Sequence, residues 1–192
     1  MSSTTAVVVP VRAFNLGKER LAGVLSPDQR AALSRRLADR VLDAVGPLPV
    51  AVVSSAREVA AWAEHRGAWV LADPGTLDAA AAVGRAWARD LGHDRVVVAH
   101  GDLARARTFD PLTSNGARSV ATIVPDQRDD GTPVLALPVT ADFEFAYGPG
   151  SFRRHVAEAR RVGLDVRVLR SPDLGFDVDL PEDLAGLSSI DR

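Results

Sequence analysis

The sequence predicts an α/β fold with one mostly parallel, mixed sheet whose two faces are covered by helices. Runs of consecutive apolar residues, such as 6–11 (AVVVPV) and 95–99 (RVVVA), are typical of strands buried on both faces of a parallel sheet. Segments with helical spacing of apolar residues separate these runs, as βαβ crossovers require. A length of 192 residues fits one domain, so we expect residues 1–192 to form a single domain.

The predicted elements alternate regularly along the chain. The first long helix has clear boundaries, because Ser26 suits the N-cap, Pro27 suits the first helical position, and Gly46 is typical of the end. A later helix is expected to be capped by Ser151 and to end at Gly163. We predict strands at 6–11, 50–53, 68–71, 95–99, 119–124, 134–137, 166–169 and 175–179, and helices at 27–45, 57–66, 77–91 and 152–162.

Charge and composition argue against several classes of protein. The formal net charge is −2 and the arginines are spread along the chain, which argues against a nucleic-acid partner. The apolar runs are strand-sized and the N-terminus lacks the pattern of a secretory signal, so we expect no membrane partner and a cytoplasmic location. The absence of cysteine excludes disulfides, thiol nucleophiles and zinc–thiolate sites.

The first candidate site is the polar loop after the first strand. Lys18 is the only lysine among 23 Lys and Arg residues, and it shares this loop with Arg12 and Arg20. Ligands in open α/β sheets bind beyond the carboxyl ends of the strands, and a compact lysine charge suits phosphate oxygens. We therefore interpret Pro10, Val11, Arg12, Lys18 and Arg20 as a triphosphate site. The glycine spacings of a Walker A loop or a dinucleotide fingerprint are absent, and the alternative is a solvated loop.

The second candidate site consists of aspartates at the ends of predicted strands. Asp102 follows the run RVVVAHG, and Asp177 and Asp179 alternate in GFDVD. Alternation along a strand places Asp177 and Asp179 on one face, where two carboxylates repel each other unless a cation lies between them. Mg²⁺ accepts a few carboxylates and bridges substrate phosphates. The alternative is that Asp179 belongs to the start of a helix at 181–183.

The third candidate site is the segment 147–152 (YGPGSF), in which two glycines precede the predicted cap Ser151. A helix N-terminus offers free backbone N–H groups and a positive dipole end, so a carboxylate or phosphate can bind there. Thr132 could supply a hydroxyl to the same ligand, although a plain turn at Gly131-Thr132 explains the residues equally well. His155 either reaches this anion or remains solvated.

The remaining histidines and the tryptophans are interpreted as structural. The histidines other than His155 show no metal-ligand spacing, so a structural or surface role is expected. The tryptophans lie on segments assigned from apolar periodicity, so we expect core packing rather than stacking on a base. These residues are His65, His93, His100, Trp62, Trp69 and Trp87.

Five segments occur in an order that resembles a known family. They are VVVPVRAFNLGKERLAGVLSPDQR, HGDLARA, VPDQRDDGT, FAYGPGSFRRHVAEARRVG and LGFDVDLPEDL. Over Val7 to Leu184 the chain is similar to the phospholactate or phosphoenolpyruvate guanylyltransferases, which act in biosynthesis of the deazaflavin coenzyme known as factor 420. The resemblance implies the single-domain, three-layer Rossmann-like fold of nucleotide-diphospho-sugar transferases. It also implies GTP as one partner and a small phosphoacid as the other, and a homodimer is one option for the assembly.

The resemblance implies a reaction and a role for each candidate residue. GMP passes from GTP to the phosphate of 2-phospholactate, phosphoenolpyruvate or 3-phosphoglycerate, pyrophosphate leaves, and Mg²⁺ is the cofactor. Nucleotide contacts fall to Arg12, Lys18, Arg20 and Asp78, acceptor contacts to Thr132, Gly148 and Ser151, metal ligands to Asp102, Asp177 and Asp179, and the main catalytic roles to Lys18 and Asp102.

The chain departs from the family pattern in several places, and the departures keep two alternatives open. Thr76-Leu77-Asp78 stands where a GLN stretch usually contacts the nucleotide, and Pro133 replaces an asparagine in the usual GTN. Ala104-Arg105 follows Asp102-Leu103 where DLP is frequent, and Arg12 replaces a frequent lysine. The alternatives are a nucleotidyltransferase for a sugar phosphate or another acid, and a non-catalytic paralogue that binds a nucleotide.

Overall fold

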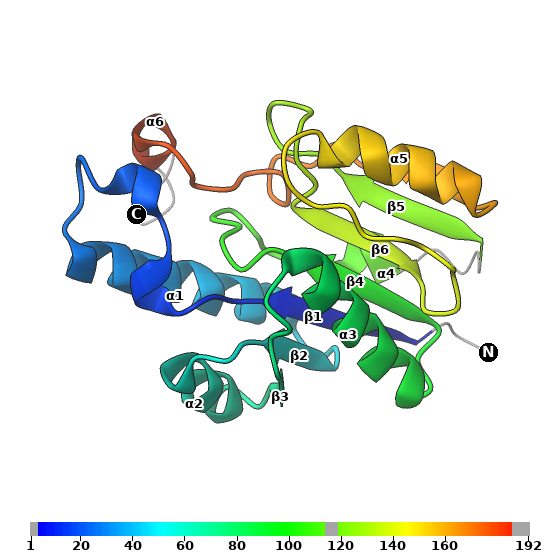
Figure 1. Ribbon diagram of the computed structural model, residues 1–192, viewed down its shortest axis with the longest axis horizontal. Helices are drawn as coiled ribbons and strands as arrows, with labels where there is room; N and C mark the ends of the chain where they lie inside the picture. The colour runs from blue at the N-terminus through cyan, green and yellow to red at the C-terminus, as the bar shows by residue number, and fades with distance from the viewer. Residues whose placement is uncertain (1–3, 114–118, 186–192) are drawn as a thin grey trace.

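The computed structural model describes residues 4–113 and 119–185, and one seven-stranded sheet forms its centre (Figure 1). The strand order is β3-β2-β1-β4-β6-β5-β7. β6 runs antiparallel to β4 and β5, whereas the other neighbouring pairs are parallel, so the predicted mostly parallel, mixed sheet is confirmed. The strands are β1 (Thr5–Pro10), β2 (Val50–Val53), β3 (Trp69–Leu71), β4 (Arg95–Ala99), β5 (Val120–Val124), β6 (Val134–Pro138) and β7 (Asp165–Val168).

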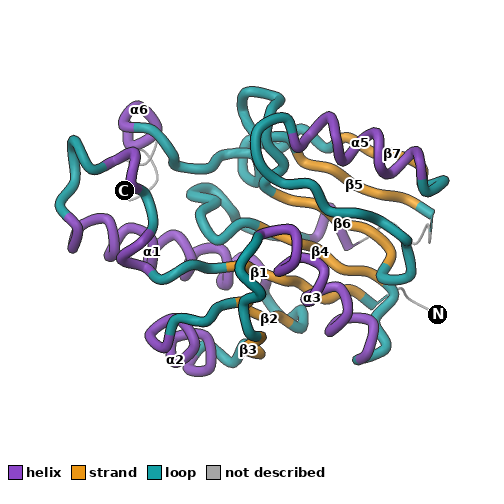
Figure 2. The backbone as a smooth tube through the Cα atoms, viewed as in Figure 1, coloured by secondary structure: helices purple, strands orange, loops and turns teal. Residues whose placement is uncertain are grey.

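Helices cover both faces of this sheet and complete three layers (Figure 2). The side chains of β1 alternate between the faces, so Val7 and Val9 pack with α1 and α2, whereas Ala6 and Val8 pack with α3 and α5. The α-helices are α1 (Pro27–Val45), α2 (Arg57–His65), α3 (Leu77–Asp90), α4 (Asp110–Thr113), α5 (Ser151–Arg161) and α6 (Pro181–Ala185), and two short 3₁₀ helices are η1 (Phe14–Leu16) and η2 (Glu19–Leu21).

α3 lies unusually close to the central strand. A Cβ atom built on Gly84 would come within 2.2 Å of a methyl group of Val8, so only glycine fits between this helix and β1. The close approach places the first turn of α3 beside the carboxyl ends of β1 and β2. Those strand ends form one edge of the candidate site described below.

The boundaries of two helices test the capping predictions. Ser26 and Gln29 form the complete capping box of α1, with Pro27 as the first helical residue, as predicted. Ser151, in contrast, is not the cap of α5. Gly150 takes that position with φ of 73°, and Ser151 is the first residue of the helix, where its hydroxyl contacts Thr132 instead.

Two further predictions differ from the structure. Residues 175–179 form no strand, because their pairing is limited to a single antiparallel bridge between Leu103 and Asp177. Trp69 lies on the edge strand β3 and is 57% exposed, so the prediction that it packs in the core is wrong. Trp62 is buried and donates a hydrogen bond to Asp39.

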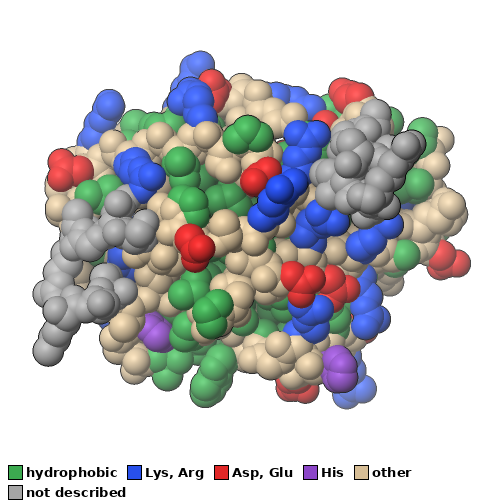
Figure 3. All heavy atoms as spheres, turned by 180° about the vertical axis from the view of Figure 1, so that it is seen from behind, with side chains coloured by type: hydrophobic (Ala, Val, Ile, Leu, Met, Phe, Trp, Pro, Cys, Tyr) green, Lys and Arg blue, Asp and Glu red, His purple; other side chains and the backbone are tan. Residues whose placement is uncertain are grey.

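None of the helices in residues 4–113 and 119–185 combines the length and the apolar character needed to cross a bilayer. Basic and acidic side chains lie interspersed on the face shown in Figure 3.

Candidate functional site

A cleft of about 540 Å³ opens at the carboxyl ends of β1, β2 and β4. The loop after β1, the start of α3 and the residues after β4 supply its walls. Seven of the predicted site residues line it together, namely Pro10, Val11, Arg12, Lys18, Arg20, Asp102 and Asp179. The five that do not line it are Asp78, Thr132, Gly148, Ser151 and Asp177. The strand-end location predicted from the sequence is therefore correct for the first group.

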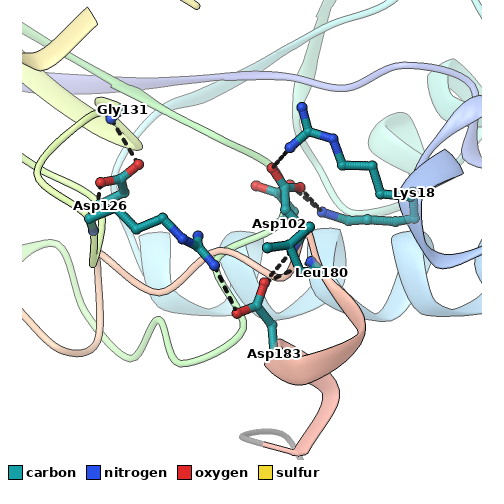
Figure 4. Close-up of polar contacts among 9 residues, drawn as sticks. Lys18, Asp102, Asp126, Gly131, Leu180 and Asp183 are labelled. Atoms are coloured by element: carbon teal, nitrogen blue, oxygen red, sulfur yellow. Dashed lines mark hydrogen bonds and ion pairs between the residues drawn. The ribbon is translucent and has the colours of Figure 1, made fainter. Parts of the chain in front are cut away.

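Lys18 lines this cleft, and Figure 4 shows its side chain pointing towards Asp102. Its backbone has φ of 60°, a left-handed conformation that L-residues seldom adopt, and it directly precedes η2. This conformation accompanies a side chain that is only 6% exposed. The ammonium donates to Asp102 Oδ2 in a close ion pair and to Asp179 Oδ1 at 3.3 Å. The alternative of a solvated loop is therefore wrong for Lys18.

The ion pair shifts the pKa of both partners towards the charged forms. Burial by itself would lower the pKa of Lys18, but the attraction of Asp102 and Asp179 outweighs burial and raises it. Burial would likewise raise the pKa of Asp102, but the charge of Lys18 and a smaller contribution from His100 lower it. Lys18 and Asp102 thus form a charged pair at neutral pH.

Asp177 lies beside this pair in a different environment. Burial, followed by repulsion from Asp102 and Asp179, raises the pKa of Asp177 to about 7. Oδ1 of Asp177 and Oδ1 of Asp102 are both buried and have no hydrogen-bond partner among the described residues. No three His, Cys, Asp or Glu side chains within 4–113 and 119–185 form a group that could hold a metal ion, so the metal-ligand role of the aspartates stays a prediction.

The start of α6, shortly after Asp179, is held by the side chain of Asp183. Asp183 Oδ2 accepts hydrogen bonds from the backbone N–H groups of Asp179 and Leu180, at 2.9 and 2.7 Å (Figure 4). Asp183 therefore satisfies the start of α6, and the carboxylate of Asp179 is left to face Lys18 and, at 3.9 Å, Arg20. The alternative that Asp179 serves as the acidic residue of the helix start is wrong. The sequence contained the relevant signal, an acidic residue three positions after Leu180.

The predicted acceptor residues lie in a buried polar network beside the same carboxyl end of β4, where the N–H of His100 donates to the Pro133 carbonyl at 2.9 Å. Thr132 and Ser151 are each 1% exposed and their hydroxyls are 3.4 Å apart. His155 is fully buried, with Nδ1 3.0 Å from the Thr132 hydroxyl and Nε2 accepting from the backbone N–H of Ala146 at 3.0 Å. The option that His155 remains solvated is wrong, because one helical turn places it under Ser151 rather than on the outer face of α5. Gly148 adopts φ of 100° in the loop before the helix.

The first backbone N–H groups of α5 already have partners. Gly150 N donates to Asp130 Oδ1 at 3.0 Å, Phe152 N donates to the Asp130 carbonyl at 2.9 Å, and Ser151 N donates to the Gly148 carbonyl at 3.0 Å. Asp126 in turn folds the preceding acidic turn by accepting from Gly131 N, as Figure 4 shows. An anion at this helix would consequently meet side-chain hydroxyls rather than these three amides.

Asp78 connects the two ends of the site. Its Oδ1 accepts a hydrogen bond of 2.6 Å from the backbone N–H of Tyr147, which ties the first turn of α3 to the loop before α5. The nucleotide contact assigned to Asp78 through the resemblance stays a prediction.

His100 and Tyr147 lie between the two ends, and the sequence alone assigned neither side chain a role in the site. His100 lines the cleft, its Nε2 is buried without a partner in the described part of the chain, and burial lowers its pKa. Its ring lies 5.6 Å from that of Tyr147, which contacts His155 edge-on at 4.8 Å. The surface option for His100 is wrong. Its position directly after a buried strand, two residues before Asp102, was the available signal.

Comparisons with known proteins agree with this architecture. The family model described as Guanylyl transferase CofC like matches residues 5–188. A phosphoenolpyruvate guanylyltransferase of Sphaerobacter thermophilus is 38% identical over 96% of this chain and 93% of its own length. A 2-phospho-L-lactate guanylyltransferase of Methanothermobacter thermautotrophicus is 31% identical over 94% of this chain and 82% of its own. A Desulfovibrio desulfuricans G20 structure assigned to the nucleotide-diphospho-sugar transferases has a TM-score of 0.75 at 19% identity, covering 99% of this chain and 89% of that one.

Proposed function

Since the chain belongs to the Guanylyl transferase CofC like family, we propose that it transfers GMP from GTP to the phosphate of a small three-carbon phosphoacid and releases pyrophosphate. One observation carries the proposal beyond family membership. The cleft at the strand ends holds Lys18, buried between two carboxylates, beside the cations Arg12 and Arg20. Three cations around a cleft with a carboxylate edge suit a triphosphate and its counter-ion.

The cations have different exposures and therefore different roles in binding the triphosphate. Lys18 is held by Asp102 and Asp179, so its ammonium has a fixed position that phosphate oxygens can approach. Arg20 is 72% exposed at the rim, where it attracts the nucleotide but gains little from any one contact. Arg12 lies on the same wall and is exposed. Lys18 is thus the residue whose contact with the phosphates contributes most.

The aspartates fit a divalent cation such as Mg²⁺. The unpartnered, buried Oδ1 atoms of Asp102 and Asp177 are hard anionic ligands, and the bridge between Leu103 and Asp177 joins the segments that carry them. Mg²⁺ is commonly held by one or two protein carboxylates together with waters and substrate phosphates, so a preformed group of three is not required. Asp102 and Asp177, with Asp179 beside them, would hold the ion. When bound it supplies neutralisation of the negative charge that develops on the phosphates.

The proposed reaction needs little proton transfer from the protein. An oxygen of the acceptor phosphate forms a bond with the α-phosphorus of GTP, the bond from that phosphorus to the bridging oxygen of the β-phosphate breaks, and pyrophosphate leaves with the electron pair. The attacking phosphate is already an anion at neutral pH, so no general base is needed. Lys18 neutralises charge on the triphosphate, and the cleft brings the two anions into line. Positioning and charge neutralisation are therefore the main contributions of this chain.

We infer the identity of the acceptor substrate from the relatives rather than from the geometry of the cleft. The two guanylyltransferase relatives described above are named for phosphoenolpyruvate and for 2-phospho-L-lactate. We extend the proposal to 3-phosphoglycerate, which has the same combination of carboxylate and phosphate, and to a place in biosynthesis of the deazaflavin coenzyme. Buried hydroxyls at Thr132 and Ser151 suit recognition of such an anion.

A product assay tests the proposal directly. The protein is incubated with Mg²⁺ and GTP, ATP, CTP or UTP, each with 2-phospholactate, phosphoenolpyruvate, 3-phosphoglycerate or glucose 1-phosphate, and the products are identified by mass spectrometry. We expect a guanylylated three-carbon acid and pyrophosphate, and loss of both in Asp177→Ala. Transfer to glucose 1-phosphate alone would support the sugar-phosphate alternative. Absence of product in every combination would refute the transfer and leave nucleotide binding without turnover.

A further inference from the structure

The network under α5 has a donor whose direction is fixed by the backbone. The N–H of Ala146 donates to His155 Nε2 at 3.0 Å, and a backbone amide can only donate. Nε2 therefore presents its lone pair. In a neutral imidazole the single ring hydrogen is then on Nδ1, which lies 3.0 Å from Thr132 Oγ1. His155 consequently donates to Thr132.

His155 stays neutral under ordinary conditions. Burial, together with the nearby positive charge of Arg154 and a smaller contribution from His100, lowers the pKa of His155 to about 4, against a weaker opposing effect of Glu158. A protonated ring would also have to place a second N–H against the amide of Ala146. The tautomer with hydrogen on Nδ1 is thus the form that matches every contact of the ring.

The hydrogen bond donated by His155 reaches one of two hydroxyls that contact each other. Thr132 Oγ1 accepts from His155 and lies 3.4 Å from Ser151 Oγ. Each hydroxyl has one hydrogen, and the contact between them uses one of the two. Whichever hydroxyl donates within the pair, the other retains a hydrogen that must point elsewhere. The chain of hydrogen bonds that starts at the Ala146 amide therefore ends in an O–H donor.

This donor differs from the other groups at the start of α5. The amides of Gly150, Ser151 and Phe152 are already bonded within the protein. The terminal hydroxyl hydrogen has no such partner among the described contacts. An anionic oxygen is the strongest acceptor it could meet.

We propose that His155 is a positioning residue for the acceptor substrate, which orients the hydroxyls of Thr132 and Ser151 so that they donate to an anionic oxygen of that substrate. The inference rests on the proposed function and deepens it, because it assigns the orientation of the hydroxyls to a residue that touches no substrate. The hydrogen-bond network ends in an O–H donor, and this donor favours an anionic oxygen in the substrate.

Matched substitutions separate positioning from structural support. His155→Gln places its amide at the Nε2 end and loses the donor to Thr132, whereas His155→Asn can place an N–H near the position of Nδ1. We expect the KM for phosphoenolpyruvate to rise about 10- to 100-fold in His155→Gln, with kcat and the Kd of GTP changed much less. His155→Asn should recover most of the loss. His65→Gln, at an exposed position on α2, controls for the chemistry of the substitution.

A double-mutant cycle tests whether His155 acts through Thr132. Thr132→Val keeps the shape of the side chain and removes the hydroxyl. If the proposal is correct, His155→Gln has little further effect on the KM for phosphoenolpyruvate in a Thr132→Val background. Additive effects, or an equal loss of GTP affinity, would show a merely structural role and overturn the proposal.

The tautomer can be observed in the wild-type protein, so the proposal remains testable even if the variants do not fold. Nitrogen-15 NMR of labelled histidine at pH 7 should show His155 protonated on Nδ1 alone. Protonation on Nε2, or on both nitrogens, would contradict the direction of the network.

Acceptor binding can be measured without turnover, which distinguishes this inference from the proposed function. Tyr147 is the only tyrosine of the chain, and its ring contacts His155 at 4.8 Å. Carbon-13 labelling of tyrosine therefore gives one signal at the site. A shift of this signal on adding phosphoenolpyruvate, weakened in His155→Gln, supports positioning even if no guanylylated product forms. Unchanged affinity in His155→Gln would refute it even if the wild-type protein is active.

Discussion

The two ends of the candidate site differ in charge and in exposure. The cleft at the ends of β1 and β4 is lined by formal charges, and its central pair of Lys18 and Asp102 is accompanied by the exposed Arg20. The network under α5 contains neutral hydroxyls and a neutral imidazole, all buried. Charged groups can exchange partners when an ionic ligand arrives, whereas a buried neutral network retains its geometry. Under the proposed function, the first end contributes affinity for the phosphates and the second fixes the orientation of the acceptor.

The largest effect is expected from removing a charge at the first end. Asp102→Asn removes the partner of Lys18 and one proposed ligand of the cation while keeping the shape of the side chain. We expect the rate of transfer, measured as pyrophosphate release, to fall about 1,000-fold. Asp173→Asn serves as the control, because Asp173 lies on the surface opposite Arg107 at 4.0 Å. Activity of Asp102→Asn within tenfold of the wild type would contradict the catalytic role.

The second effect distinguishes a buried cation from an exposed one. Lys18→Met should weaken GTP binding about 10- to 100-fold by calorimetry, because a charge-assisted hydrogen bond is lost from a fixed position. Lys18→Arg should not restore GTP binding. The Lys18 side chain is only 6% exposed, and the planar guanidinium does not fit the space that it occupies. Arg20→Met, at a position 72% exposed, should weaken binding less than about fivefold. Equal losses at the two positions would show that burial does not matter here.

The first end was the more predictable from sequence. Buried strands such as β1 and β4 have a polar residue only at their first position, so their apolar pattern is clear, and parallel topology brings their carboxyl ends to one edge. The location of Lys18 and Asp102 follows from that rule. The contact of Lys18 with Asp179 does not, because Asp179 lies 161 residues further along a segment that forms no regular strand.

The second end could not be predicted from local patterns. Ser151 has the residue type and position of a cap, yet the glycine before it takes that role and its hydroxyl turns towards Thr132. Asp130, which is distant in sequence, accepts hydrogen bonds from the amides of Gly150 and Phe152 at this helix start. Tertiary contacts determine which residue caps α5, and the local sequence pattern contains no direct information about these contacts.

The third effect concerns the stability of the buried network as a function of pH. The folded-state pKa of His155 is about 4 and that of an unfolded histidine is about 6.5, so the unfolded chain takes up the proton first as the pH falls. The stability associated with neutral His155 is complete above pH 6.5 and decreases down to about pH 4, by about 3 kcal/mol in all. Urea unfolding at pH 7 and pH 4 should show this loss in the wild type and a smaller one in His155→Gln. An identical pH dependence in both proteins would contradict a neutral, buried ring.

The smallest effect comes from an ion pair at the other end of the same helix. Glu158 accepts from Arg161, and this hydrogen bond is the main reason why the pKa of Glu158 is lowered to about 2 from 4.5. The contribution of Glu158 to stability is therefore present above about pH 4.5 and is lost as the pH falls towards 2, a window below that of His155. Arg161 is 56% exposed, so solvent screening should keep the effect of Glu158→Gln below half of that expected for His155.

Urea unfolding at pH 7 in low salt and in 1 M salt distinguishes the two groups. The effect of Glu158→Gln should shrink in high salt because exposed charges are screened, whereas the difference made by His155 between pH 7 and pH 4 should persist, since a buried ring is shielded from the ions. If salt altered both to the same extent, the ring of His155 would have to be accessible to solvent, and the contrast between a charged, open end and a neutral, closed one would fail.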